Sequence, residues 1–136
     1  PVNTKASGLY MICTLSKHEA ERQGFDDSLM LDYRGYVAEA TGANIFFIKN
    51  KDLYTPIADC FLDGITRRTV ISLAEQNNLK VTEKRILLDD LDNYDECFVT
   101  GTAAEVTPVN SIEKFKFTPG EVCKLLMQKY SDLTLS

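Results

Sequence analysis

Lys5 stands among small and polar neighbours in the run NTKASG. Burial of a lysine penalises its ammonium form and lowers its pKa, and the resulting neutral amine is a nucleophile. The alternative is an exposed lysine close to a chain end, which the local composition by itself favours. Lys5 is therefore a candidate nucleophile that needs support from other residues.

Glu39 lies between Ala38 and Ala40, in a run that otherwise has the composition of a buried strand. An isolated buried charge is costly, so a buried Glu39 needs a cationic partner. The simpler alternative is a strand carboxylate that faces water. If Glu39 is buried, its position predicts a site for a protonated group.

Two further segments offer backbone N–H groups to an anion. In the run DGITR, residues 63–67, a loop becomes a helix, and the N–H groups at a helix N-terminus attract phosphate or carboxylate. In the run GTAA, residues 101–104, a turn without bulky side chains can form an anion-binding concavity. A simply capped helix and a plain tight turn are the alternatives.

Taken singly, each of these features favours its structural explanation, but together they match one kind of ligand. A nucleophilic lysine, a carboxylate and two backbone anion sites suit a molecule with an aldehyde, a protonated ring nitrogen and a phosphate. Pyridoxal phosphate has all three groups. The set of features therefore predicts a pyridoxal phosphate site.

The composition argues against several other classes of protein. The chain has 136 residues, 44% hydrophobic and 26% charged, which is typical of one globular domain. A net charge of -5 and a pI of about 4.9 leave no basic stripe for nucleic acid. No apolar run approaches the roughly 20 residues that span a bilayer. We expect a single domain over residues 1–136 with no nucleic-acid or membrane partner.

The cysteines and the histidine do not form a metal-binding pattern. A zinc site requires close cysteine pairs with histidine, whereas the only histidine, His18, lies in a charged stretch that predicts a solvated helix face. Buried, reduced thiols predict a cytoplasmic protein. The four cysteines are far apart and never form a C-x-x-C pair: Cys13, Cys60, Cys97 and Cys123.

The hydrophobic periodicity predicts an α+β domain in which hairpins come first and helices then alternate with strands. Thr118 and Pro119 predict the N-cap and first position of the last helix. The expected helices are 8–23, 66–77 and one that runs to about residue 130. The expected strands are 28–33, 36–40, 44–49, 53–55, 80–86, 96–100, 106–109 and 112–115, with an acidic turn at 89–93.

Four long stretches, in order, resemble the C-terminal domain of branched-chain amino acid aminotransferases, which are class IV pyridoxal-phosphate enzymes with the D-amino acid aminotransferase-like fold. The resemblance covers nearly the whole chain. It implies a pseudo-barrel domain of mixed and antiparallel strands with flanking helices. The stretches are NTKASGLY, LDYRGYVAEATGANIFF, LYTPIADCFLDGITRRTVISLA and YDECFVTGTAAEVTPV.

The resemblance also implies roles for the residues nearest the cofactor ring. Lys5 matches the lysine to which the cofactor attaches, and its amine would then move a proton at the substrate Cα. Tyr10 matches the tyrosine that hydrogen-bonds the ring oxygen. Glu39 matches the carboxylate that keeps the pyridine nitrogen protonated.

The remaining implied roles concern anions. Ile65 and Thr66 match the residues that bind the cofactor phosphate through backbone N–H groups and the threonine hydroxyl. The Thr102 hydroxyl matches a further phosphate ligand. The N–H groups of Thr102 and Ala103 match donors to the substrate carboxylate.

The implied reaction transfers the amino group of leucine, isoleucine or valine to 2-oxoglutarate. Other enzymes on this fold are alternatives: D-amino acid aminotransferases, R-selective amine transaminases and aminodeoxychorismate lyase. A non-catalytic remnant or assembly domain with the same fold is an alternative from another class. The run TGTAAEVTPV resembles the branched-chain enzymes most closely.

The resemblance also implies partners for this domain. Family members have an N-terminal domain that supplies an arginine to the phosphate and part of the substrate pocket, and they form homodimers or larger homo-oligomers. These 136 residues contain nothing that matches that domain. We therefore expect an N-terminally truncated fragment that is inactive, or nearly so, by itself.

Overall fold

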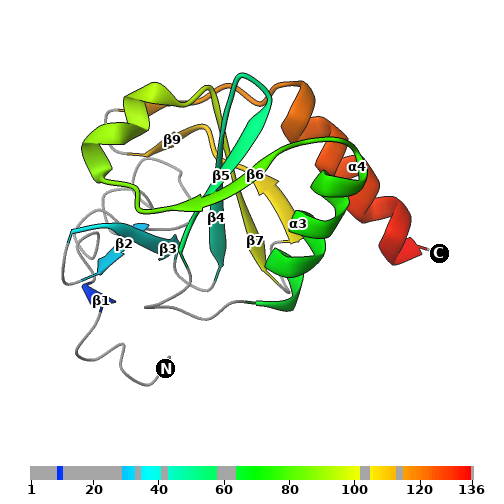
Figure 1. Ribbon diagram of the computed structural model, residues 1–136, viewed down its shortest axis with the longest axis horizontal. Helices are drawn as coiled ribbons and strands as arrows, with labels where there is room; N and C mark the ends of the chain where they lie inside the picture. The colour runs from blue at the N-terminus through cyan, green and yellow to red at the C-terminus, as the bar shows by residue number, and fades with distance from the viewer. Residues whose placement is uncertain are drawn as a thin grey trace.

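The computed structural model describes residues 9–10, 29–32, 35–40, 43–57, 64–101, 105–112 and 115–135. Its centre is a mixed five-stranded sheet with the strand order β6-β5-β4-β7-β8 (Figure 1). The pair β5–β6 is parallel, and the other neighbouring pairs are antiparallel. These strands are β4 (Asn44–Lys49), β5 (Asp52–Pro56), β6 (Val81–Lys84), β7 (Glu96–Gly101) and β8 (Glu105–Pro108).

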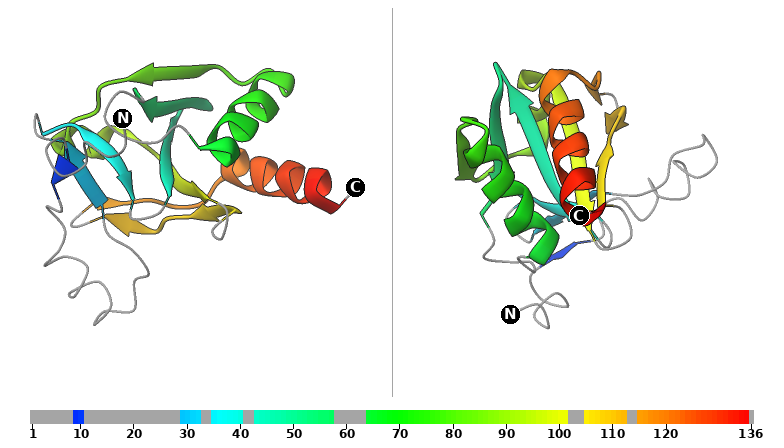
Figure 2. Two further views of the ribbon diagram at one scale, coloured as in Figure 1. Left: turned by 90° about the horizontal axis from the view of Figure 1, so that it is seen from below. Right: turned by 90° about the vertical axis from the view of Figure 1, so that its right-hand side faces the viewer.

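Two helices pack against one face of this sheet: α3 (Ile65–Gln76) and α4 (Glu121–Leu135). Figure 2 shows them side by side on that face. Their apolar stripes, which include Val70 and Leu126, share a core with alternate residues of the sheet such as Phe46 and Phe98. Stacking of Phe46 on Phe98, with ring centroids 4.9 Å apart, fills the centre of this core.

The intervening residues of the same strands form a second core on the opposite face. Ile45, Phe47 and Val99 contact residues of a three-stranded antiparallel sheet, β1-β2-β3, and of a short hairpin, β9–β10. Period-two alternation of apolar residues on both faces is what a sheet covered on both sides requires. The covering elements are β1 (Leu9–Tyr10), β2 (Leu29–Asp32), β3 (Val37–Ala40), the 3₁₀ helix η2 (Leu88–Asn93), β9 (Ser111–Ile112) and β10 (Phe115–Lys116).

Left-handed backbone conformations occur at the expected turns. Asn50 and Lys51 have φ values of 51° and 70°, which gives the tight β4–β5 hairpin its twist. Gly35, at φ 89°, occupies the predicted turn between β2 and β3. Asn78, at φ 63°, follows the end of α3. The predicted α+β class and the hairpins of the first half are confirmed.

Three local predictions are wrong. Leu9 and Tyr10 do not start a helix, because they pair with β2 as strand β1; the rest of the segment 11–23 lies outside the described residues. The predicted strand 112–115 is not one strand, because Ile112 belongs to β9 and Phe115 to β10, and these two residues pair with each other. Thr118 is not an N-cap, since α4 begins at Glu121 and continues to Leu135.

No helix in the described part of the chain is long and apolar enough to cross a membrane.

Candidate active site

Glu39 is buried, with 5% of its surface exposed. It is the third residue of β3 and pairs with Met30 of β2. A register shift between Met30 and Leu31 separates this pair from the next one, Leu31 with Val37, whose two members belong to the core between the two larger sheets. The structure therefore resolves the alternative left open by the sequence: this carboxylate does not face water.

The start of α3 is open to an anion. Gly64 precedes the first turn in an extended conformation, and no side-chain cap bond or acidic first-turn residue is present among the described residues. Ile65 is 76% exposed even though it is a large apolar residue. The first N–H groups of a helix lack partners within the helix, and the dipole adds partial positive charge there. This turn can therefore bind a phosphate or carboxylate.

Asn44 connects this turn to two strands. The Gly64 N–H donates to Asn44 Oδ1 at 3.3 Å, and Asn44, the first residue of β4, pairs with Thr100 near the end of β7. Directly opposed residues of an antiparallel pair point to the same face. The Thr100 hydroxyl is buried, with no hydrogen-bond partner in the described ranges. One end of the sheet thus combines an open helix start with an unused buried hydroxyl.

Other predicted segments follow or precede strands that end on the side of the sheet where α3 begins. β7 ends at Gly101, the first residue of the predicted anion-binding turn 101–104, and Gly101 pairs with Glu105 of β8. β3 ends at Ala40, close in sequence to the start of β4, and the two strands are in contact. Ile65 and Thr66 lie in the first turn of α3.

Several predicted site residues remain untested. Lys5, Thr102 and Ala103 lie outside the described residues, as does His18. Tyr10 is placed only by its backbone, opposite Leu31 in β2. Their roles remain predictions.

The sequence reasoning missed three buried polar residues that hold this edge together: Asn44, Thr55 and Arg67. A signal for Arg67 existed, because it occupies the same helical stripe as the buried Val70 and Ala74. A charged residue on the apolar stripe of a helix is unusual unless it is paired. Asn44 and Thr55 gave no comparable signal, since polar residues are common at strand ends.

The described thiols are structural. Cys97 and Cys123 are both buried and free. Burial raises the pKa of Cys97 well above its ordinary value, and the neighbouring Cys123 adds to the shift. Burial, followed by the charge of Glu96, raises the pKa of Cys123 to about 11. Neither thiol has the lowered pKa of a reactive cysteine.

Within the described ranges, no three histidine, cysteine, aspartate or glutamate side chains form a group that could hold a metal ion. The polar groups at this end of the sheet are instead the N–H groups of the α3 start, the Thr100 hydroxyl and the buried Glu39 carboxylate. Such a set fits a ligand that carries an anion at one end and a protonated group at the other.

The fold is that of a class of aminotransferases. The family described as amino-transferase class IV matches residues 1–112, and the chain belongs to this family.

Individual proteins similar to this chain are named more specifically than the family. A probable branched-chain-amino-acid aminotransferase of Rickettsia felis is 47% identical over 134 residues, which are 96% of this chain and 46% of that protein. The crystal structure of a branched-chain aminotransferase from Thermoproteus uzoniensis with norvaline superposes with a TM-score of 0.82 at 37% identity, covering 89% of this chain and 41% of that one. An aminotransferase from Brucella abortus bound to the cofactor PLP superposes with a TM-score of 0.80 at 32% identity, and the match covers 88% of this chain and 43% of that one. The resemblance seen in the sequence is confirmed, and the chain spans less than half the length of these proteins.

Proposed function

We propose that a protein containing this chain transfers amino groups from leucine, isoleucine or valine to 2-oxoglutarate with pyridoxal phosphate as cofactor. The observation that carries the proposal is the buried Glu39 in a domain whose α3 presents an uncapped first turn. The similar proteins support it, because two of the three are named branched-chain aminotransferases and the third binds PLP.

Two groups of this chain are suited to bind the cofactor at its ends. The N–H groups of Ile65 and Thr66 would hold the phosphate, with the hydroxyls of Thr66 and Thr102 as further donors. The Glu39 carboxylate would keep the ring nitrogen protonated, and its burial strengthens that interaction because water does not screen it. Tyr10 would donate to the ring oxygen.

The proposed chemistry takes place at the substrate Cα. The cofactor supplies an electron sink for the charge that develops when the Cα–H bond breaks. Lys5 would remove that proton and return it to the cofactor side. The N–H groups of Thr102 and Ala103 would hold the substrate carboxylate and thereby orient the Cα–H bond.

The proposal extends to the context of the domain. Its relatives are about twice as long, and we expect the part of such a protein outside these residues to supply an arginine to the phosphate and part of the side-chain pocket. We therefore expect negligible transamination by residues 1–136 alone. A cytoplasmic location is part of the same proposal, supported by the free, buried thiols of Cys97 and Cys123. A homo-oligomer is also part of it, because the resemblance to the class IV enzymes implies one.

Titration with pyridoxal phosphate tests the proposal. The protein as its gene encodes it should develop the visible absorbance of a covalently attached cofactor, and Lys5→Ala should abolish it. Glu39→Gln should retain attachment but lower the transamination rate by roughly 10²-fold or more, because the neutral amide cannot hold the proton. Absence of the band in the unaltered protein would support the non-catalytic alternative. Activity confined to D-amino acids, or lyase activity, would assign another class IV enzyme.

A further inference from the structure

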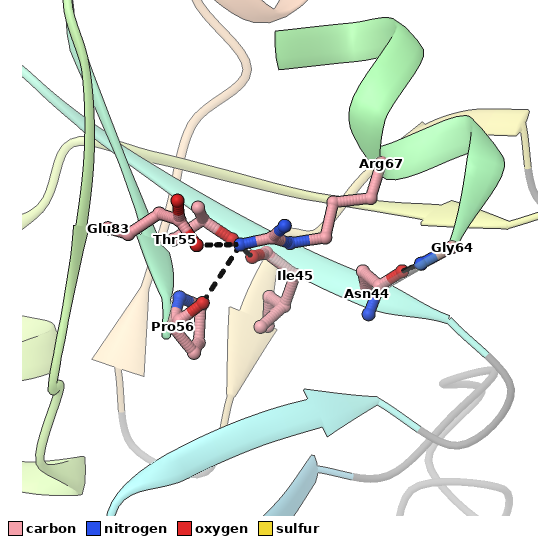
Figure 3. A network of polar contacts seen from close by, with 7 residues as sticks. All are labelled: Asn44, Ile45, Thr55, Pro56, Gly64, Arg67 and Glu83. Carbon is pink, nitrogen blue, oxygen red and sulfur yellow. Dashed lines mark hydrogen bonds and ion pairs between the residues drawn. The ribbon is translucent and has the colours of Figure 1, made fainter. Parts of the chain in front are cut away.

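The guanidinium of Arg67 fastens the first turn of α3 to the sheet. Its Nη2 donates to the carbonyl oxygen of Pro56 at 3.0 Å and lies 2.9 Å from Glu83 Oε1 (Figure 3). Pro56 ends β5 and Glu83 lies in the neighbouring parallel strand β6. Only 2% of the Arg67 side chain is exposed. One side chain therefore joins the start of the helix to both strands.

The β4–β5 ladder ends before it reaches α3, and side-chain donors take the place of backbone donors beyond that end. The regular β4–β5 pairing extends no further toward α3 than Phe47 and Tyr54. Pro56 has no N–H to offer, and the hydroxyl of the buried Thr55 donates to the carbonyl oxygen of Ile45 at 2.8 Å. The carbonyl groups of Ile45 and Pro56 are thus satisfied by Thr55 and Arg67 in place of the ladder.

Asn44 holds the same turn of α3 from the β4 side. Its Oδ1 accepts the Gly64 N–H, and a Cβ on Gly64 would come within 3.0 Å of that oxygen (Figure 3). The Gly64 backbone is therefore in close contact with β4. Asn44 and Arg67 act on the residues just before and just after Ile65 and Thr66.

The Arg67 charge is paired with Glu83 within the fold. Burying the Arg67 guanidinium costs desolvation energy, and its ion pair with the half-exposed Glu83 offsets that cost, so the pair adds little net stability. Its value to a bound anion would therefore be geometric. Arg68, the next residue of the same turn, is exposed and provides a comparison.

We propose that Arg67 and Asn44 are positioning residues that hold the Ile65 and Thr66 N–H groups in the geometry needed to bind the cofactor phosphate. This inference rests on the proposed function. Neither side chain needs to touch the cofactor, because each acts through the backbone of the α3 start.

The test compares two cofactor forms on the cofactor-free protein as its gene encodes it. Pyridoxal phosphate and pyridoxal share the ring and the aldehyde, but only the former carries the phosphate. We expect Arg67→Met to raise the Kd of pyridoxal phosphate on the order of tenfold, about 1.4 kcal/mol, and to leave the Kd of pyridoxal within about twofold. Arg68→Met removes the same charge from the same turn, and we expect it to change neither Kd more than about threefold, because exposed charges are screened.

Asn44→Ala provides a second variant if Arg67→Met does not fold. We expect the same selective loss of pyridoxal phosphate affinity, whereas Asn77→Ala, at the other end of α3, should leave both affinities unchanged. The Asn77 side chain donates to the Leu73 carbonyl oxygen at 2.7 Å, so that control also removes one hydrogen bond to the α3 region. Inorganic phosphate provides a readout without the cofactor: it should raise the Tm of the unaltered protein and raise that of either positioning variant less.

Each outcome has a distinct meaning. Equal losses of affinity for pyridoxal phosphate and pyridoxal in Arg67→Met and Asn44→Ala would show a general structural role and overturn the inference. Unchanged affinities for both ligands would overturn it as well. If the unaltered protein binds neither ligand, the proposed function fails first and the inference fails with it.

Discussion

The starts of α3 and α4 lie against the same sheet but differ in what satisfies their N–H groups. At α4, the buried Glu96 carboxylate accepts from Gly120 N–H at 2.8 Å and from Cys123 N–H at 3.0 Å. At α3, among the described residues, no side-chain cap bond is made. Asn44 there accepts the N–H of Gly64, which lies before the first turn.

This difference distinguishes the start of α4, which has a structural role, from the start of α3, which can bind a ligand. A carboxylate from the sheet already complements the dipole of α4, so an external anion would meet repulsion there. The start of α3 is held in place by neutral and paired groups that leave its first-turn donors available. The presence of a helix N-terminus therefore does not by itself identify an anion-binding site. Whether the first-turn N–H groups can bind an anion depends on which groups of the protein already accept from them.

The largest expected effect comes from removing the internal cap. Glu96→Ala leaves one buried and one partly buried N–H group without their acceptor, and we expect a loss of about 2–3 kcal/mol in the free energy of unfolding, measured by urea titration. Glu96→Gln keeps one acceptor oxygen and should lose less than half of that. Pyridoxal phosphate affinity should stay unchanged in both. A matching loss of cofactor affinity would mean that the two helix starts are not independent.

Alanine substitutions at the glycines that directly precede α3 and α4 test the comparison more closely. A Cβ on Gly120 would lie 2.9 Å from the Glu96 carboxylate, which cannot move without breaking both cap bonds. We expect Gly120→Ala to cost about 2 kcal/mol of stability. Gly64→Ala should cost less than about 1 kcal/mol, since it disturbs one longer hydrogen bond and its φ of -68° suits alanine. Thermal denaturation of the pair tests this order, and equal losses would contradict it.

The pH dependence of stability reports on the occupied helix start. A cysteine in the first turn of a helix usually has a lowered pKa, yet burial and Glu96 raise that of Cys123 to about 11. The folded thiol holds its proton more tightly than the unfolded one, whose ordinary value is 9.0. This contribution is therefore present below about pH 9 and is lost toward pH 11, by at most about 1.4 kcal/mol per pH unit. Urea unfolding between about pH 8 and pH 10 should show a shallower loss in Cys123→Ala; an unchanged slope would refute the assignment.

The smallest effect has opposite signs in two measurements. Ile65→Glu places a carboxylate at the open start of α3, on an exposed side chain. We expect the free energy of unfolding to rise by about 0.5 kcal/mol and pyridoxal phosphate affinity to fall, because the new charge complements the dipole but repels phosphate. Ile65→Gln is the uncharged control. A gain in both stability and affinity would show that the phosphate binds elsewhere.

The elements that follow local rules were predictable from sequence. The predicted strand 44–49 matches β4, and the predicted helix 66–77 is displaced by one residue from α3. The last helix was misplaced at its start because the Thr118–Pro119 signal is local, whereas its cap comes from Glu96 on β7. Turn chemistry within the chain cannot reveal an acceptor more than 20 residues away.

A buried Glu39 was one of two alternatives that the sequence left open, whereas the residues that support the start of α3 were not predicted. Glu39 was recognised, although its burial depends on strands that pair only in the folded protein. Thr55 was missed because its partner, Ile45, lies on another strand. A buried polar residue is explained by tertiary contacts, which a single sequence does not display.

The parallel β5–β6 pair has a consequence for the order of folding. Helix α3 crosses between these two strands, and the two Arg67 contacts close loops of only 11 and 16 residues. The Glu96 contacts that cap α4 close loops of 24 and 27 residues. Loop-closure entropy grows with length, so the β5–α3–β6 unit pays the smaller entropic cost. We expect the α3 start to take its final geometry before the α4 start is capped.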